Sequence, residues 1–273
     1  MKRALATLTA LTAAALAVAA PEASATPPIP TRMVALGDSL SRGVNACTAG
    51  QFCGWKSWST GSDPAVRSHW SRIHELNPDV IAYNDAKAGA GVAHLAGTQV
   101  RTALAHGGID YVTIMIGTRD ACAPTEAGMT SVGDFEGRFR TAMKALHAGA
   151  PEASVFVASI PDLKQVWELG KDNEAARKAW ADAPLCGSMF ANPASRAPQD
   201  EARRDRVRDR IMDYNAALDK VCAEFAGTCR YDGDAVFDHR FTAADISTTD
   251  FFHPSAAGQR TLADVTYEAG FDW

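Results

Sequence analysis

The sequence has no surplus of basic charge, no low-complexity linker and, after its first 20 residues, no long apolar segment. The 27 Lys and Arg against 32 Asp and Glu give a net charge of −5, which argues against a nucleic-acid partner. No later run reaches the length that spans a bilayer, so stable membrane insertion is not expected. Without internal repeats or linkers, a single domain is expected.

The amino terminus has the layout of a secretory signal peptide. Basic residues at positions 2 and 3 precede an apolar run over residues 4–20, and Ala23-Ser24-Ala25 offers a small-x-small cleavage site. A transmembrane anchor is the alternative, but the run is mostly alanine and barely reaches spanning length. We expect residues 1–25 to be removed as a signal peptide, and residues 26–273 to form one secreted, extracellular domain.

Six cysteines in an exported chain indicate disulfides, and six thiols allow fifteen pairings. Cys47 and Cys53 are close in sequence, as are Cys222 and Cys229. If both pairs close locally, Cys122 bridges to Cys186, and the long loop it closes stabilises the fold by roughly 4 kcal/mol in the chain-entropy model. Structural zinc is the rival interpretation, but the sequence has neither a C-x-x-C pair nor a nearby Cys/His cluster.

Short apolar runs alternate with helical patterns. The runs cover residues 33–36, 80–83, 111–116 and 155–160. Each is apolar on both faces, as in a parallel sheet that helices cover on both sides. Stripes with three- to four-residue spacing cover residues 92–104, 135–146 and 207–225. The pattern predicts an α/β fold, a doubly wound three-layer α/β/α sandwich, whose active cleft lies beyond the carboxyl ends of the strands.

A cluster of arginines overlaps the start of the longest stripe. Positions 203, 204, 206, 208 and 210 are arginine, interleaved with Asp205 and Asp209. The mixed charges favour a solvated helix face over a binding patch.

Polar motifs follow three of the apolar runs, and a fourth lies near the end of the chain. They are Gly37-Asp38-Ser39-Leu40, the segment from Asn84 to Gly89, Gly117-Thr118-Arg119-Asp120, and Asp250-Phe251-Phe252-His253-Pro254. A serine just past a strand end can project into the cleft. The G-x-S-x-G motif of most α/β-hydrolases is absent, and Gly-Asp-Ser alone also fits a capped turn.

The motifs contain the groups that serine hydrolysis needs. A serine hydroxyl is a poor nucleophile until a base removes its proton, and imidazole titrates near neutrality. A carboxylate three residues before the histidine can fix its tautomer and stabilise its cation. Ser39, His253 and Asp250 are therefore the candidate catalytic residues.

The four motifs, in this order, resemble the four blocks of the SGNH (GDSL-type) hydrolase family. The resemblance covers the expected mature chain and is strongest to secreted actinobacterial esterases and lipases, which also tend to have six cysteines and a Trp-rich loop after the first block. It implies a flavodoxin-like sheet, Ser39 as nucleophile, Asp250 and His253 as acid and base, and the backbone N–H groups of Ser39 and Gly89 as oxyanion-hole donors. It implies no cofactor and no metal.

One position departs from the family pattern. The third block normally reads Gly-x-Asn-Asp, whose asparagine is the third oxyanion donor, whereas this chain has Arg119. A guanidinium also donates hydrogen bonds, but it is longer and can turn aside or pair with a carboxylate such as Asp120. Loss of one preorganised donor typically costs about 100- to 1,000-fold in rate.

These features predict a secreted serine esterase or lipase that acts on carboxylic esters through an acyl-enzyme. A polysaccharide O-deacetylase is the alternative within this class, and a weakly active or inactive glycan- or lipid-binding module is the alternative outside it. The expected partners are small-molecule, lipid or glycan esters; the oligomeric state is not predicted. Phe52, Trp55 and Trp58 form either a substrate-gripping rim or a small packed sub-core.

Overall fold

The computed structural model describes residues 27–47, 52–183 and 185–273, and the expected signal peptide lies outside them. Five parallel strands form one sheet in the order β2-β1-β3-β4-β5. The strands are β1 (Arg32–Gly37), β2 (Ile81–Asn84), β3 (Tyr111–Met115), β4 (Ser154–Val157) and β5 (Cys229–Tyr231). This is the flavodoxin-like order, and it confirms the expected parallel sheet.

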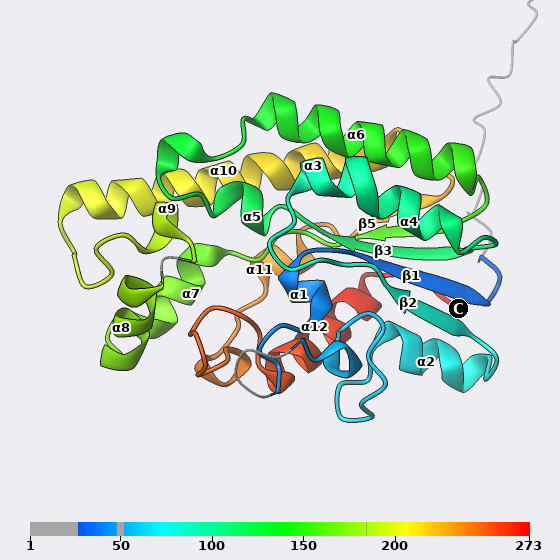
Figure 1. The fold of residues 1–273 in the computed structure, drawn as a ribbon, viewed down its shortest axis with the longest axis horizontal. Helices are drawn as coiled ribbons and strands as arrows, with labels where there is room; N and C mark the ends of the chain where they lie inside the picture. The colour runs from blue at the N-terminus through cyan, green and yellow to red at the C-terminus, as the bar shows by residue number, and fades with distance from the viewer. Residues whose placement is uncertain (1–26, 48–51, 184) are drawn as a thin grey trace, which may run out of the picture.

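Helices cover both faces of the sheet (Figure 1). On one face lie α3 (Val92–His94), α4 (Val100–Ala105), α6 (Val132–Gly149) and α10 (Pro198–Ala223); on the other lie α2 (His69–Leu76) and α12 (Ala256–Glu268). The remaining helices are α1 (Ser39–Arg42), α5 (Thr118–Ala121), α7 (Leu163–Gly170), α8 (Glu174–Asp182), α9 (Gly187–Phe190) and α11 (Ala235–Asp238), with a π-helical turn, η2 (Leu95–Gln99), and short 3₁₀ turns η1 (Gly54–Lys56), η3 (Glu126–Gly128) and η4 (Ala243–Asp245).

The side chains of β1 alternate between two buried clusters, as a strand covered on both faces requires. Val34 and Leu36 pack with the α6 and α10 side, whereas Met33 packs with Ile73 of α2 and Leu262 of α12. All of these side chains are almost wholly buried. The sheet is thus the middle layer of the predicted α/β/α sandwich.

The fifth strand was not predicted. β5 has three residues, reads Cys-Arg-Tyr and lies at the edge of the sheet with none of its residues fully buried. An edge strand of this length has too little buried surface to leave an apolar run in the sequence. The predicted helix over residues 92–104 was also too simple, because η2 interrupts it between α3 and α4.

The arginine-rich stretch is only partly the solvated face that was expected. The Arg204 side chain is fully buried, with its guanidinium carbon 3.9 Å from the centre of the Trp167 ring, and it donates to the carbonyls of Asn192 and Ser195. The expectation was wrong here because position 204 lies one helical turn before Val207 and so belongs to the core-facing stripe.

The structure pairs the cysteines as Cys47–Cys53, Cys122–Cys186 and Cys222–Cys229. The Cys122–Cys186 bond ties the segment after β3 to the start of α9, two segments that are 64 residues apart in the chain. In the part of the chain that the structure describes, no helix is both long enough and apolar enough to cross a membrane.

Candidate active site

Ser39 is the first residue of α1, directly beyond the end of β1. The turn depends on Gly37, which has a φ of +137° and excludes any side chain, because a Cβ there would lie 2.2 Å from the Met115 carbonyl oxygen. The buried Gln99 amide holds the same turn by accepting from Gly37 N–H and donating to Gly37 C=O, both at 2.8 Å. Gln99 is the last residue of the π turn η2, so this irregular turn positions the amide that holds Gly37, two residues before Ser39.

Two backbone N–H groups are free to stabilise an oxyanion. Neither Ser39 N–H nor Gly89 N–H has a hydrogen-bond acceptor among the described residues. Gly89 has a φ of +75°, and a Cβ there would project into open space rather than into protein. Because a side chain in that space would obstruct a substrate, glycine suits a donor at this position.

The buried carboxylate of Asp120 fixes the segment that follows Gly89. It accepts from Val92 N–H at 2.9 Å and from the Thr130 hydroxyl at 2.9 Å. Burial raises the pKa of Asp120, and these two hydrogen bonds oppose that rise. Asp120 therefore links the motif after β3 to the motif after β2.

His253 and Asp250 form a tight pair at the other side of the cleft. His253 Nδ1 lies 2.5 Å from Asp250 Oδ2, and the other carboxylate oxygen accepts from the backbone N–H groups of Phe252 and His253 at 3.0 Å. Burial opposes the charge on Asp250, but its hydrogen bonds and the His253 charge outweigh burial, so the pKa of Asp250 lies below its usual value. The carboxylate is thus available to orient the ring.

Asn45 is a member of this site that no motif in the sequence reveals. Its Nδ2 donates to Asp250 Oδ2 at 2.8 Å, across 205 positions of the chain. The residue adopts a φ of +56°, a conformation that asparagine tolerates better than most residues. Asn45 therefore holds the carboxylate oxygen that faces His253.

The predicted residues meet around one pocket of about 210 Å³, here called the active-site pocket. Ser39, Gly89, Arg119 and His253 all line it, whereas Asp250 lies behind His253. No hydrogen bond joins the Ser39 hydroxyl to the His253 imidazole among the described contacts. Such bonds are often long in an unliganded site and tighten in the substrate complex.

Arg119 lies exposed at the mouth of this pocket, in α5. Its Nη1 donates to the carbonyl oxygen of Cys122 at 2.5 Å, and it makes no ion pair among the described residues. The side chain is therefore held by its own turn of backbone and not by Asp120, the carboxylate weighed as its partner.

The predicted aromatic loop is divided between two roles. Trp58 is fully buried, whereas Phe52 and Trp55 are 60% and 48% exposed.

The described residues contain no group of three or more His, Cys, Asp or Glu side chains placed to hold a metal ion.

Asp38, the residue before the candidate nucleophile, predicts a pH-dependent stability. Burial raises the pKa of Asp38 to about 6, although its hydrogen bond from Leu40 N–H opposes the rise. The folded protein then holds a proton that the unfolded chain has already lost, so the free energy of unfolding falls as pH rises from about 4 to 6. Between pH 4 and pH 7 we therefore expect the free energy of unfolding of Asp38→Asn to rise by about 2–3 kcal/mol relative to that of wild type. Urea unfolding of both proteins at pH 4 and pH 7 tests this. The same difference in stability between the two proteins at both pH values would refute it.

A model of the GDSL-like lipase/acylhydrolase family matches residues 35–261. The chain belongs to this family. A comparison with curated protein sequences gives no match. Among solved structures, the family member is similar to an extracellular lipase from Streptomyces rimosus, with 20% identity, coverage of 88% of this chain and 99% of that one, and a TM-score of 0.53.

Two further structures are similar to this GDSL-like hydrolase. A single-site variant of an acetyl xylan esterase from Geobacillus stearothermophilus has 15% identity, coverage of 89% and 96%, and a TM-score of 0.52. Phospholipase A1 from Streptomyces albidoflavus has 18% identity, coverage of 87% and 99%, and a TM-score of 0.50. At these identities the similarities establish the fold of the hydrolase.

Proposed function

We propose that this GDSL-like hydrolase is a secreted serine esterase that cleaves carboxylic esters through an acyl-enzyme. The observation that carries the proposal is the convergence of Ser39, the His253–Asp250 pair and two unoccupied N–H donors on one pocket. An amino-terminal segment of signal-peptide type and three disulfides support secretion.

The first half-reaction acylates the serine. His253 Nδ1 faces Asp250, which leaves Nε2 to take the proton from Ser39 Oγ as that oxygen attacks the ester carbonyl. The negative charge moves to the carbonyl oxygen, where the Ser39 and Gly89 N–H groups stabilise it. When the intermediate collapses, the C–O bond to the alcohol breaks and His253 returns the proton to the leaving alcohol.

The second half-reaction releases the acid. His253 takes a proton from a water molecule whose oxygen attacks the acyl-enzyme carbonyl, and the same N–H groups hold the second oxyanion. Collapse breaks the bond to Ser39 Oγ, which recovers the proton from His253. Esters of small or lipidic acids are the substrates we propose, with O-acetylated polysaccharide as the alternative, in keeping with the lipase and acetyl xylan esterase named among the similar structures.

Hydrolysis of 4-nitrophenyl acetate and butanoate by the purified mature protein tests the proposal, with Ser39→Ala as the control. We expect saturable release of nitrophenol that the control lacks. The specific alternative is a binding module, which Arg119 favours by replacing an oxyanion donor. No turnover by a folded protein that still binds a glycan or lipid would support that alternative.

Arg119→Asn is expected to raise kcat on these esters up to about tenfold while KM changes little. The guanidinium donates to the Cys122 carbonyl and would have to reorganise to reach an oxyanion, whereas a preorganised donor contributes mainly in the transition state. A tenfold gain corresponds to about 1.4 kcal/mol. Steady-state kinetics measure it, and a lower kcat would mean that Arg119 itself assists the reaction.

A further inference from the structure

The active-site pocket shares lining residues with two other cavities, and these two differ in character. Ala88 also lines a cavity of about 520 Å³, and Phe252 also lines one of about 30 Å³. An ester bound at Ser39 sends its acyl and alcohol halves in different directions. The lining of each cavity therefore indicates which half it suits.

The larger cavity has the more polar lining of the two and carries charged side chains. Arg42, Asp85, Lys87 and His94 contribute to its wall, and the exposed ring of Phe52 lies at its side. Burying a hydrocarbon chain against such groups would cost them their hydration. This cavity suits the alcohol half of a substrate.

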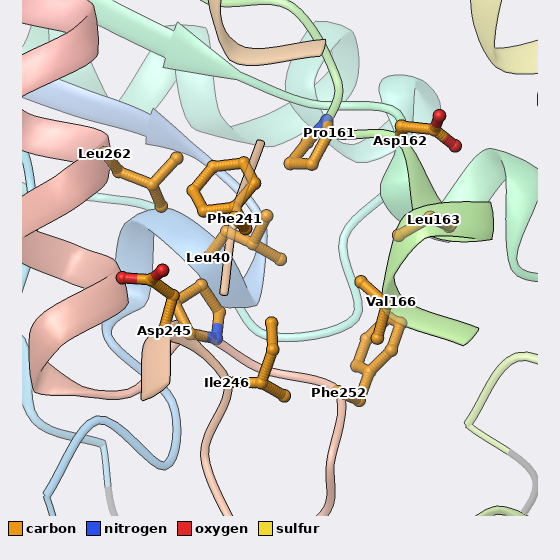
Figure 2. A pocket seen from close by; sticks show the side chains of 11 residues that line it. Leu40, Pro161, Asp162, Leu163, Val166, Phe241, Asp245, Ile246, Phe252 and Leu262 are labelled. Carbon is orange, nitrogen blue, oxygen red and sulfur yellow. The ribbon is translucent and has the colours of Figure 1, made fainter. Parts of the chain in front are cut away.

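The smaller cavity, called the inner pocket below, is apolar. Figure 2 shows the side chains of Leu40, Phe241, Ile246 and Leu262 around it, together with those of Val166 and Phe252. Val166 and Ile246 also line a third cavity, of about 110 Å³, between α7 and the segment around Phe251. Apolar surface thus continues from the inner pocket into the third cavity.

Two carboxylates near the inner pocket do not make it polar. Asp162 caps α7 through Lys164 N–H and pairs with Arg208, and Asp245 accepts from the Thr242 and Thr261 hydroxyls. In Figure 2 both carboxylates point away from the centre of the pocket. Their hydrogen bonds are satisfied elsewhere, so an apolar group in the pocket would leave no charge unpaired.

The ring of Phe252 lines both the active-site pocket and the inner pocket. It is 8% exposed, packs edge-to-face on Phe190 at 5.9 Å, and meets the His253 ring edge-to-face at 5.0 Å. These two contacts oppose movement of the ring. Phe252 is therefore a firmly packed part of the wall that the active-site pocket and the inner pocket share.

We propose that Phe252 limits the length of the acyl chain: the chain runs from the ester carbonyl held at Ser39 Oγ towards this ring, and the inner pocket lies beyond the ring. This inference rests on the proposed esterase function and adds the substrate class, which is esters of short-chain acids. Each methylene that gains a buried apolar site is worth about a fourfold increase in kcat/KM. Removal of the ring should therefore raise kcat/KM for esters of longer acids relative to esters of shorter ones.

The test compares kcat/KM for 4-nitrophenyl butanoate and octanoate in wild type, Phe252→Ala and Phe252→Leu. Wild type is expected to prefer butanoate. Phe252→Ala should raise the octanoate-to-butanoate ratio at least about tenfold, since the octanoate chain gains up to four buried methylenes, and Phe252→Leu should fall between. The ratio reports chain recognition even if loss of the contact with His253 lowers both rates.

Two further variants distinguish a specific effect on the acyl chain from a general loosening of the active site. Val166→Phe, which adds bulk to the lining of the inner pocket, should reverse the gain when combined with Phe252→Ala. Phe251→Ala removes an equal ring that lines the third cavity but neither the active-site pocket nor the inner pocket, and it should leave the ratio unchanged. Circular dichroism and thermal melting establish that each variant is folded.

The outcomes are distinguishable. If Phe252→Ala is active but has the same octanoate-to-butanoate ratio as wild type, the role of Phe252 is wrong and the esterase function stands. The same conclusion follows if Phe252→Ala raises the ratio but the added Val166→Phe does not lower it again. If the folded wild type hydrolyses neither ester, the esterase function and this inference both fail.

Discussion

Ser39→Ala is expected to lower kcat for an activated aryl ester by about 10⁴- to 10⁶-fold, the range found when a triad nucleophile is removed. Without Oγ no acyl-enzyme can form, and the two N–H donors can only assist direct attack by water. The fold should not suffer, because the Ser39 side chain is partly exposed and accounts for none of the described hydrogen bonds. Urea unfolding should place its stability within about 0.5 kcal/mol of wild type.

Ser41→Ala is the matched control for this loss. Ser41 lies in the same short helix, and its buried hydroxyl has no hydrogen-bond partner among the described residues, so its removal should leave kcat within a few-fold of wild type. If Ser39→Ala hydrolysed the ester at a rate comparable to that of Ser41→Ala, another residue would be the nucleophile.

Asp250→Asn is expected to lower kcat by about 10³- to 10⁴-fold with little change in fold. An amide in place of the carboxylate can present N–H to the imidazole and favour the wrong tautomer, and it cannot stabilise the imidazolium. The pKa of Asp250 lies below its usual value, so the wild-type carboxylate is ionised throughout the neutral range. The kcat of both proteins measured from pH 5 to pH 9 should differ across the whole range.

Asn45→Gly supplies the graded comparison. Glycine keeps the positive φ of this residue and removes the side chain that donates to Asp250 Oδ2, a hydrogen bond to a charged group worth about 1.5 kcal/mol, or roughly tenfold in kcat. A loss from Asp250→Asn no larger than that from Asn45→Gly would mean that the carboxylate is not what orients His253.

The parallel sheet was predictable because β1, β3 and β4 are buried on both faces and so appear as apolar runs. The edge strand β2 is exposed to half-buried, but its segment is still an apolar run in the sequence. The same logic placed Ser39, Gly89 and Arg119 beyond strand ends, where the structure gathers them around one pocket. The exposed edge strand β5 and the buried Arg204 were not predicted, since the first has no apolar run and the second has the charge of a surface residue.

The residues that position the site, Asn45 and Gln99, could not be predicted from the sequence for a different reason. Asn45 meets Asp250, and Gln99 meets Gly37, only after the chain has folded. Neither residue lies in a motif, and an amide in a loop or helix has no distinguishing pattern. The role proposed for Phe252 likewise depends on which cavities its ring lines in the folded protein.

Labelling with a fluorophosphonate, followed by peptide mass spectrometry, tests the central claim most directly. The reagent reacts with a serine only where a base and an oxyanion hole activate it. The account predicts one adduct, on Ser39, which forms together with loss of esterase activity and is absent from Ser39→Ala. An adduct on another serine, or a folded and active protein that takes up no label, would contradict it.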